Sequence, residues 1–200
     1  MSFKKFRAAR VWSNRELSRF APRLKGSVVN VSAWRDEDKE GRHYRDYFGG
    51  DYTITNYSGP YRGIQGLPGE LELDLSVPIE GHWHRRFDVV FSHTVLEHIY
   101  EVQTAFRNLC EMSRDVVIVV VPFLQEQHGA FDYWRFTPLA IEGMFRENGM
   151  QLAYLSANDG DGSIYLFAIG VRHTPQRFAA ERGNLADRLG DVRLGCEVVK

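Results

Sequence analysis

The chain has 200 residues, of which 44% are hydrophobic and 26% are charged, and its formal net charge is -1. This composition is typical of a globular domain, and the near-neutral charge gives no overall attraction to nucleic acid. No apolar run reaches the length of a membrane span, and the N-terminal region lacks an apolar signal core, so we expect no membrane span and a cytoplasmic location. Cys110 and Cys196 lie far apart, which is typical of free thiols in a reducing compartment.

Strands and helices are predicted to alternate along most of the chain. Short apolar or β-branched runs predict strands over residues 27–32, 51–56, 70–75, 87–92, 115–123, 150–156 and 163–173. Amphipathic spacing predicts helices over residues 10–24, 94–112 and 138–148. Ser13 is a candidate N-cap of the first helix, and Thr137 with Pro138 is a candidate start of the last.

This alternation predicts an α/β fold, in which a mostly parallel sheet is covered by helices on both faces. The charged segment 33–50 is expected to be a long loop leading into a short helix, and the Gly- and Pro-rich segment 57–69 a loop. A predicted turn over residues 158–162 suggests that the last two strands pair as an antiparallel hairpin. We expect one domain over residues 1–173, including the N-terminal helix, and a surface appendage over 174–200.

Two stretches of the chain carry a resemblance to a known family. The run from Phe87 to Ile99 (FDVVFSHTVLEHI) resembles the fourth-strand region of class I S-adenosylmethionine-dependent methyltransferases. Val121-Pro-Phe123, His128 and the run from Asp132 to Thr137 (DYWRFT) resemble the same group. More narrowly, the chain is similar to small methyltransferase-like proteins linked to polysaccharide and glycolipid assembly. The resemblance covers roughly residues 27–171 and implies a three-layer, doubly wound, seven-stranded sheet of order 3-2-1-4-5-7-6 with the last strand antiparallel.

The resemblance also implies where S-adenosylmethionine would bind. Ligands of such sheets bind beyond the carboxyl ends of the strands. The positions implied for the cofactor are Asn30, Ser32, Ala33, Asn56, Asp74, Leu75 and His93.

Only Asp74 matches the family pattern outright. The glycine-rich turn of the family falls on residues 30–34, where Ser32, Ala33 and Trp34 add side chains that glycine lacks. Asn56 stands where the family has a ribose-binding acid, a change worth roughly 1 kcal/mol and so less than tenfold in affinity. For His93, a place near the cofactor and a role as a capping or core histidine are both open.

The polar and aromatic loop over residues 125–137 is expected to lie over the pocket. His128 is a candidate general base because its unperturbed pKa lies near neutrality, and Asp132 is a candidate orienting carboxylate. Trp34, Tyr133, Trp134 and Arg135 are the candidate substrate-binding residues. The structural alternative is a loop held shut by an Asp132–Arg135 pair and aromatic packing.

The leading hypothesis is a small methyltransferase that uses S-adenosylmethionine and acts on a hydroxyl of a sugar, a glycolipid precursor or a related metabolite. A metal site is not expected, because the His82-Trp-His84 pair has no carboxylate pair nearby. The alternative is a non-catalytic protein of the same fold that binds a partner protein or a metabolite. The expected partner is a small-molecule or glycan-type acceptor rather than nucleic acid, and a homodimer is an open alternative to a monomer.

Overall fold

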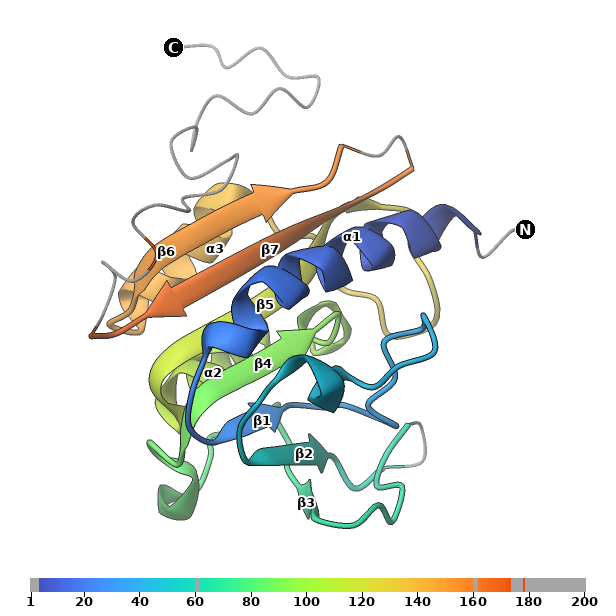
Figure 1. Ribbon diagram of the computed structural model, residues 1–200. Helices are drawn as coiled ribbons and strands as arrows, with labels where there is room; N and C mark the ends of the chain where they lie inside the picture. Colours follow the sequence, from blue (N-terminus) through green and yellow to red (C-terminus); the bar gives the residue numbers. More distant parts are fainter. Residues whose placement is uncertain (1–3, 60–61, 160–161, 174–177, 179–200) are drawn as a thin grey trace.

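A computed structural model describes residues 4–59, 62–159, 162–173 and 178. Their strands form one sheet of order β3-β2-β1-β4-β5-β7-β6, which confirms the predicted topology (Figure 1). The strands are β1 (Val28–Asn30), β2 (Tyr52–Asn56), β3 (Glu70–Glu72), β4 (Phe87–His93), β5 (Ser113–Gln125), β6 (Gln151–Ala157) and β7 (Ser163–Val171). The pairs from β3 through to β5 are parallel, and β7 runs antiparallel to both β5 and β6.

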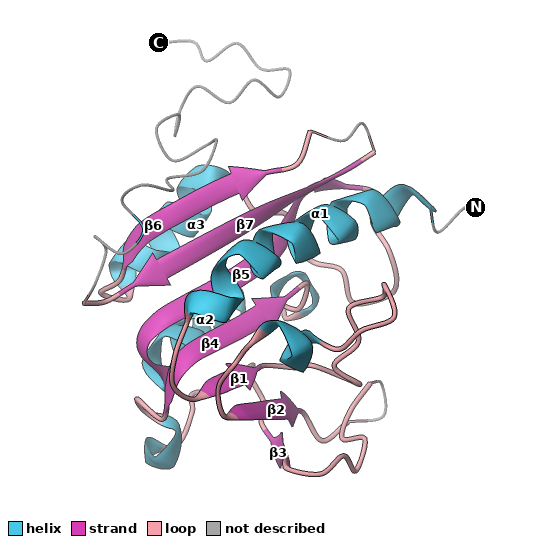
Figure 2. Ribbon diagram, in the orientation of Figure 1, coloured by secondary structure: helices cyan, strands magenta, loops and turns pink. Residues whose placement is uncertain are grey.

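Helices cover both faces of the sheet (Figure 2). The helix α1 (Lys4–Phe20), with the 3₁₀ turn η1 (Ala21–Arg23), packs on one face, and α2 (Val102–Met112) and α3 (Pro138–Glu147) pack on the other. The connection between β1 and β2 contains the short 3₁₀ helix η2 (Tyr44–Tyr47), in agreement with the predicted loop and short helix. A further 3₁₀ turn, η3 (Gly81–Trp83), precedes β4.

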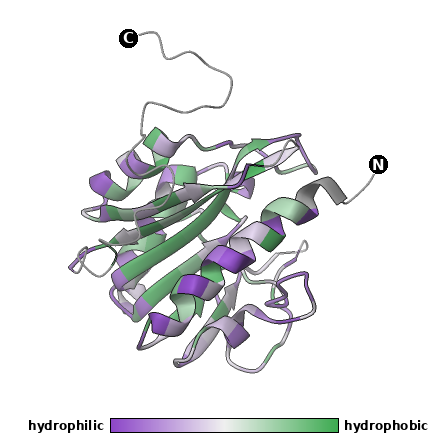
Figure 3. Cartoon of the chain, turned by 45° about the horizontal axis from the view of Figure 1, so that its top comes forward, coloured by the Kyte–Doolittle hydropathy of each residue, from purple (hydrophilic) through white to green (hydrophobic). Residues whose placement is uncertain are grey.

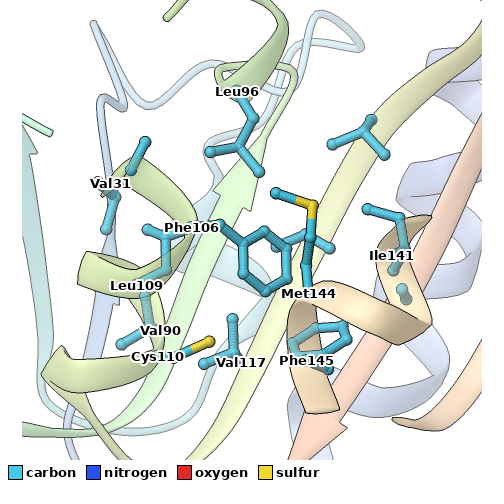
Figure 4. Close-up of a cluster of buried hydrophobic side chains, with 14 of the residues drawn as sticks. Val31, Val90, Leu96, Phe106, Leu109, Cys110, Val117, Ile141, Met144 and Phe145 are labelled. Carbon is cyan, nitrogen blue, oxygen red and sulfur yellow. The ribbon is translucent and has the colours of Figure 1, made fainter. Parts of the chain in front are cut away.

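The larger apolar core lies between the sheet and the pair α2 and α3 (Figure 4). Phe106 of α2 and Phe145 of α3 meet edge to face within it, with ring centroids 4.9 Å apart. A Cβ atom on Gly170 of β7 would lie 2.3 Å from the Phe145 ring, so the glycine provides the space that this ring fills. Figure 3 shows the apolar strands beneath helices that carry polar residues on their outer surfaces.

The helix predicted over residues 94–112 is interrupted. It begins as the 3₁₀ turn η4 (Leu96–His98) and continues as α2 only from Val102. The carbonyl of Glu97 accepts hydrogen bonds from the backbone amides of Tyr133 and Trp134, and the carbonyl of Ile99 accepts one from the Trp134 indole. These carbonyls serve the loop after β5 instead of an α-helix, which explains the break.

Two of the predictions concern the ends of the chain. The N-cap prediction for Ser13 is wrong, because α1 already begins at Lys4 and Ser13 is buried within it. The predicted appendage over 174–200 lies outside the described residues except for Phe178, which is buried beside Phe20. Within the described part of the chain, no helix is long and apolar enough to cross a membrane.

Candidate active site

Strained backbone gathers at the carboxyl edge of the sheet. Ser32, Trp34 and Asp36, which follow β1, have φ angles of 54°, 51° and 62°, and Thr94, which follows β4, has a φ of 52°. A side chain in this left-handed region costs about 1–2 kcal/mol, and such strain clusters at functional sites. The same edge is where ligands of parallel sheets bind. The glycines of the family turn are absent, yet the turn adopts left-handed conformations that glycine would favour.

The turn after β1 is fastened to the end of β2. The backbone amides of Ser32 and Ala33 donate to the Thr55 hydroxyl at 3.3 Å and the Thr55 carbonyl at 3.0 Å. The Trp34 amide donates to Asn56 Oδ1 at 2.7 Å, and Asn56 Nδ2 donates to the Trp34 carbonyl at 2.9 Å. These backbone amides hold the turn on β2, so they are not directed at a ligand.

The buried Asn56 amide is used within the protein. Besides its two bonds to Trp34, its Nδ2 donates to the Glu70 carboxylate. Glu70 in turn accepts from the backbone amides of Gln65 and Leu67 at 3.0 Å. Asn56 therefore links the turn after β1 to β3. Both polar atoms of its side chain already form hydrogen bonds within the protein, so they are not free to bind a ribose.

Trp34 lies among cations. Lys39 Nζ lies 4.2 Å from the indole centroid, and the guanidinium groups of Arg35 and Arg62 lie 5.2 and 5.1 Å away. Cation–π contacts of this kind are worth about 0.5–1 kcal/mol each at exposed sites. The indole thus lies at the carboxyl edge of the sheet, and its role in substrate binding stays a prediction.

Asn30 is buried at the end of β1. Its Nδ2 donates to Asp36 Oδ1 at 2.9 Å, and the Tyr52 hydroxyl donates to the same oxygen at 2.7 Å. Asp36 also accepts from the Arg45 amide at 3.1 Å. Asn30 thus supports the conformation of the segment that carries Trp34.

Asp74 and Leu75 occupy opposite environments. The Asp74 carboxylate is exposed, and its Oδ1 accepts from the amide and hydroxyl of Ser76 at 2.8 and 2.7 Å. Leu75 is buried in the core, and its carbonyl accepts from Asn108 Nδ2 at 3.0 Å. Of the two side chains, only that of Asp74 is open to a ligand.

His93 lies under α1 rather than in an open pocket. Its Nε2 shares a hydrogen bond of 2.8 Å with the Ser13 hydroxyl, and Arg10 Nη1 lies 3.3 Å from its Nδ1. The Tyr44 ring packs against it with centroids 5.3 Å apart. Burial, and then the nearby Arg10 cation, lower the pKa of His93 well below its usual value. His93 is therefore buried beneath α1, and its place near the cofactor stays a prediction.

The loop after β5 is tied together by Arg135. Asp132 has a fully buried side chain and accepts a two-point ion pair from Arg135 at 2.6 and 2.7 Å. Arg135 also donates to the carbonyls of Gln125, Glu126 and Trp134. Burial alone would raise the pKa of Asp132, but the bonds from Arg135 and the loop backbone outweigh it and lower this pKa to about 2. The predicted Asp132–Arg135 pair is therefore present and holds the loop.

His128 is half-buried and touches the same carboxylate. Its Nδ1 lies 3.1 Å from Asp132 Oδ2 and 2.9 Å from Gln125 Nε2. Its ring also packs edge to face on that of His98, with centroids 5.0 Å apart. A carboxylate near Nδ1 favours a proton on Nδ1, and a protonated Nδ1 requires the Gln125 amide oxygen rather than its nitrogen to face the ring. In that tautomer Nε2 is the nitrogen that accepts a proton, which is the arrangement a general base needs.

Sequence reasoning gave Glu97 no functional role. This residue of η4 is 1% exposed, and its Oε2 has no hydrogen-bond partner among the described residues. Burial raises the pKa of Glu97 to about 8. A buried carboxyl with a strongly shifted pKa marks a candidate functional site. The signal in the sequence was an acid directly after the apolar residues Val95 and Leu96, after the end of β4.

Two hollows differ in their relation to this edge. One of about 580 Å³ is lined by residues of α2, α3 and the loop after β5, among them Tyr100, Val102, Trp134, Phe136 and Met144. The other, of about 620 Å³, is lined by residues that include Gly26, Ser27, Asp51, Asp88 and Arg114. The second lies at the amino ends of the parallel strands, so the first is the candidate substrate pocket.

Exposed aromatic side chains stand beside the candidate pocket. Tyr100 contacts Tyr133 edge to face at 5.5 Å, and the Tyr100 and Trp134 rings lie 6.2 Å apart. All three are exposed, and we call them the aromatic shelf. The structure thus brings the predicted residues Tyr133 and Trp134 to one surface, whereas the Arg135 guanidinium serves the loop itself.

Known proteins resemble this chain in fold rather than in sequence. Neither protein-family models nor curated protein sequences give a match. Among solved structures, a chain from the complex between a Haloferax volcanii methyltransferase activator and a methyltransferase superposes with a TM-score of 0.62, at 14% identity over 85% of this chain and 92% of that one.

Two further solved structures contain the cofactor or its demethylated product. Magnesium protoporphyrin IX methyltransferase from Synechocystis with bound S-adenosylmethionine gives a TM-score of 0.60, at 12% identity over 86% of this chain and 85% of that one. A Burkholderia thailandensis 1,6-didemethyltoxoflavin-N1-methyltransferase with bound S-adenosylhomocysteine gives 0.56, at 17% identity over 81% and 80%. This chain therefore has the α/β fold of class I S-adenosylmethionine-dependent methyltransferases.

Proposed function

We propose that the protein is an S-adenosylmethionine-dependent methyltransferase that methylates a hydroxyl of a small or glycan-type acceptor. The observation that supports this best is the gathering of strained backbone at the carboxyl edge of a methyltransferase sheet. A cytoplasmic location and a homodimer remain predictions that accompany this proposal.

The residues at this edge fit the cofactor in part. The left-handed turn after β1 and the exposed Asp74 carboxylate suit the positions that the fold offers to it. Asn56 does not fit as a ribose ligand, because its amide is already used by Trp34 and Glu70. When bound, S-adenosylmethionine would supply an activated methyl group.

In this proposal the acceptor hydroxyl is activated by His128. Asp132 holds the imidazole at its Nδ1, and the ring takes the proton that the hydroxyl loses as its oxygen gains the methyl group. Arg135 keeps Asp132 ionised and in place.

The proposed acceptor class is a sugar, a glycolipid precursor or a related metabolite. The resemblance of the chain to polysaccharide-linked proteins supports it. The aromatic shelf also supports it, because aromatic rings with polar tips suit a ligand that is apolar on one face and hydroxylated at its rim. The test is transfer of a labelled methyl group from S-adenosylmethionine to a panel of polyhydroxylated acceptors. Labelled product with amines or carboxylates alone would contradict the acceptor class.

Asp74 gives a prediction for the cofactor. Asp74→Ala is expected to weaken binding of S-adenosylhomocysteine by about ten- to hundredfold, the effect of one lost hydrogen bond to a charged group. Asp74→Asn is the matched control, since it keeps an oxygen for Ser76 while removing the charge. Calorimetry that gives equal affinity for wild type and Asp74→Ala would remove Asp74 from the cofactor site.

A non-catalytic role is the second candidate, and one observation favours it. The backbone amides of the turn after β1 donate to residues of β2, and both polar atoms of the Asn56 side chain are hydrogen-bonded within the protein. These internal bonds replace the contacts expected for adenosine. A protein of this kind would bind a metabolite or a partner protein without the cofactor. Undetectable binding of both S-adenosylmethionine and S-adenosylhomocysteine would favour this alternative.

A further inference from the structure

The cations around Trp34 have no part in the reaction as described so far. Trp34 and Arg35 follow β1, and Lys39 lies further along the same connection to β2. Arg62 belongs to the connection between β2 and β3. Both connections leave the sheet beyond the arrowheads of β1 and β2 (Figure 1). Three cations from two segments therefore converge on one indole, at the edge where ligands of parallel sheets bind.

This convergence is unfavourable for the protein alone. Each cation lies within about 5 Å of the indole centroid, so no two of them are more than about 10 Å apart, and like charges at such distances repel. The backbones of Trp34, Lys39 and Arg62 also have left-handed φ angles of 51°, 66° and 56°. Strain of this kind clusters at ligand clamps and active sites. Charge repulsion and backbone strain thus occur together at one surface position, and a bound anion would relieve the repulsion.

Two of the guanidinium groups in this region are free to bind a ligand. Three other cations in the connection between β1 and β2 have a carboxylate oxygen at 2.6 to 3.5 Å, namely Lys39, Arg42 and Arg45. Within the residues that the structure describes, Arg35 and Arg62 form no ion pair, and both side chains are exposed. Arg35 Nε donates to the Gln65 amide oxygen at 3.4 Å, which leaves its two terminal nitrogens for a ligand.

The chemistry of these groups indicates a phosphate. A guanidinium group presents a planar fork of N–H donors that matches two oxygens of one phosphate, and such charge-assisted hydrogen bonds are strong. A single exposed ion pair contributes little, so an anion has to engage several cations at once. A phosphate monoester carries up to two charges and three acceptor oxygens, whereas a carboxylate has one charge and two oxygens. Two guanidinium groups beside an ammonium group therefore suit a phosphate better than a carboxylate.

The same cations lie close to the proposed catalytic loop. Burial lowers the pKa of His98, and the nearby Arg62 cation acts in the same direction. The His98 ring in turn packs on the His128 ring, with centroids 5.0 Å apart. Arg62 is thus within electrostatic reach of the histidine pair as well as in contact with Trp34. A ligand whose phosphate is anchored at Arg62 can extend its remaining groups toward the proposed base.

We propose that Arg35 and Arg62, with Lys39 beside them, bind a phosphate group of the acceptor, which makes the substrate a phosphorylated sugar. Trp34 is then a positioning residue, because its ring holds the cations together through cation–π contacts. A sugar linked to a nucleoside diphosphate and a sugar linked to a lipid diphosphate share this chemistry. The inference rests on the proposed methyltransferase function for the reaction, but the binding of phosphate does not depend on it.

The binding test is calorimetry with glucose 1-phosphate at low salt, without any cofactor. The wild type should bind it, and Arg35→Gln and Arg62→Gln should each weaken binding by about ten- to hundredfold, the effect of one lost charge-assisted hydrogen bond. The matched control is Arg86→Gln. Arg86 also lies on an aromatic ring, that of Trp83 at 4.9 Å, but it precedes β4 at the opposite edge of the sheet, so this variant should bind like the wild type. Equal affinity in all four proteins, or no binding by the wild type, would overturn the inference.

Two further comparisons sharpen this test. Trp34→Phe keeps an aromatic ring and should retain most of the affinity for glucose 1-phosphate, whereas Trp34→Leu should lose it although both variants fold. Uridine diphosphate and geranyl diphosphate carry the same group on a nucleoside and on an apolar chain. Whichever binds the wild type more tightly than inorganic diphosphate identifies the source, and Arg62→Gln should weaken both. Equal affinity of Trp34→Phe and Trp34→Leu would overturn the positioning role of the indole.

The outcome is independent of the proposed function. Loss of glucose 1-phosphate binding in Arg62→Gln supports the inference even if the wild type binds no S-adenosylhomocysteine, in which case only the methyltransferase proposal fails. Weaker binding of S-adenosylhomocysteine in Arg62→Gln, with unchanged binding of glucose 1-phosphate, would assign these cations to the cofactor and overturn the inference. Melting temperatures within a few degrees of wild type confirm that the variants fold.

Discussion

Replacing His128 with alanine is expected to lower turnover by about 10²–10⁴-fold, the usual contribution of a positioned general base. The affinity for S-adenosylhomocysteine should stay nearly unchanged, because His128 lies in the loop after β5 and not in the turn after β1. The imidazole contacts Asp132 and Gln125 through Nδ1, so its loss removes proton transfer while the Asp132–Arg135 pair remains. Single-turnover rates and calorimetry measure the two effects separately.

The control for this prediction is His82→Ala. His82 is an exposed histidine of η3, before β4, and its replacement should leave turnover unchanged. Asp132→Asn is expected to act in the same direction as His128→Ala, because it weakens the hold on the imidazole and also the two-point bond from Arg135. Full turnover in His128→Ala would show that the base assignment is wrong and that the loop serves as a lid or a partner surface.

Asn56→Asp is expected to destabilise the protein by about 2–4 kcal/mol, although it introduces the acid of the methyltransferase pattern that the sequence resembles. Asn56 Nδ2 donates to the Trp34 carbonyl and to Glu70, and a carboxylate can donate to neither. The new charge would also lie beside the Glu70 carboxylate, and like charges repel strongly where water is excluded. Urea unfolding of wild type and variant measures the change.

The double variant Asn56→Asp/Glu70→Gln tests the reason for this loss. A glutamine at position 70 removes the charge repulsion and can donate to the aspartate, so part of the lost stability should return. The affinity for S-adenosylhomocysteine should not rise in Asn56→Asp, since the side chain holds the β1 turn. A stable Asn56→Asp protein with about tenfold tighter cofactor binding would show instead that position 56 faces the ribose.

The strands of the sheet could be predicted from the sequence because their signals are local, whereas their order was implied by the resemblance to the methyltransferase family. Runs such as the one that became β5 are largely apolar, and their alternation with amphipathic segments leaves few topologies. The break between η4 and α2 could not be predicted in this way. It arises when the carbonyls of Glu97 and Ile99 bond to Tyr133 and Trp134, which lie far along the chain on a different loop.

The same distinction applies to the candidate site. The proximity of His128, Asp132 and Arg135 followed from their spacing within one loop. The burial of His93 did not, because it depends on α1 folding back to place Ser13 and Arg10 against the ring. The use of the Asn56 amide by Trp34 is likewise a contact between two separate strand ends. Glu97 was passed over because its unsatisfied oxygen is a property of the folded protein alone.

We propose that this fold binds S-adenosylmethionine at the carboxyl edge of its sheet. The most direct test is a calorimetric titration of the wild-type chain with S-adenosylhomocysteine. Saturable binding at one site per chain is expected, weakened in Asp74→Ala and unchanged in His128→Ala. The absence of binding heat up to millimolar ligand, together with an unchanged melting temperature, would contradict it and leave the non-catalytic role as the better account.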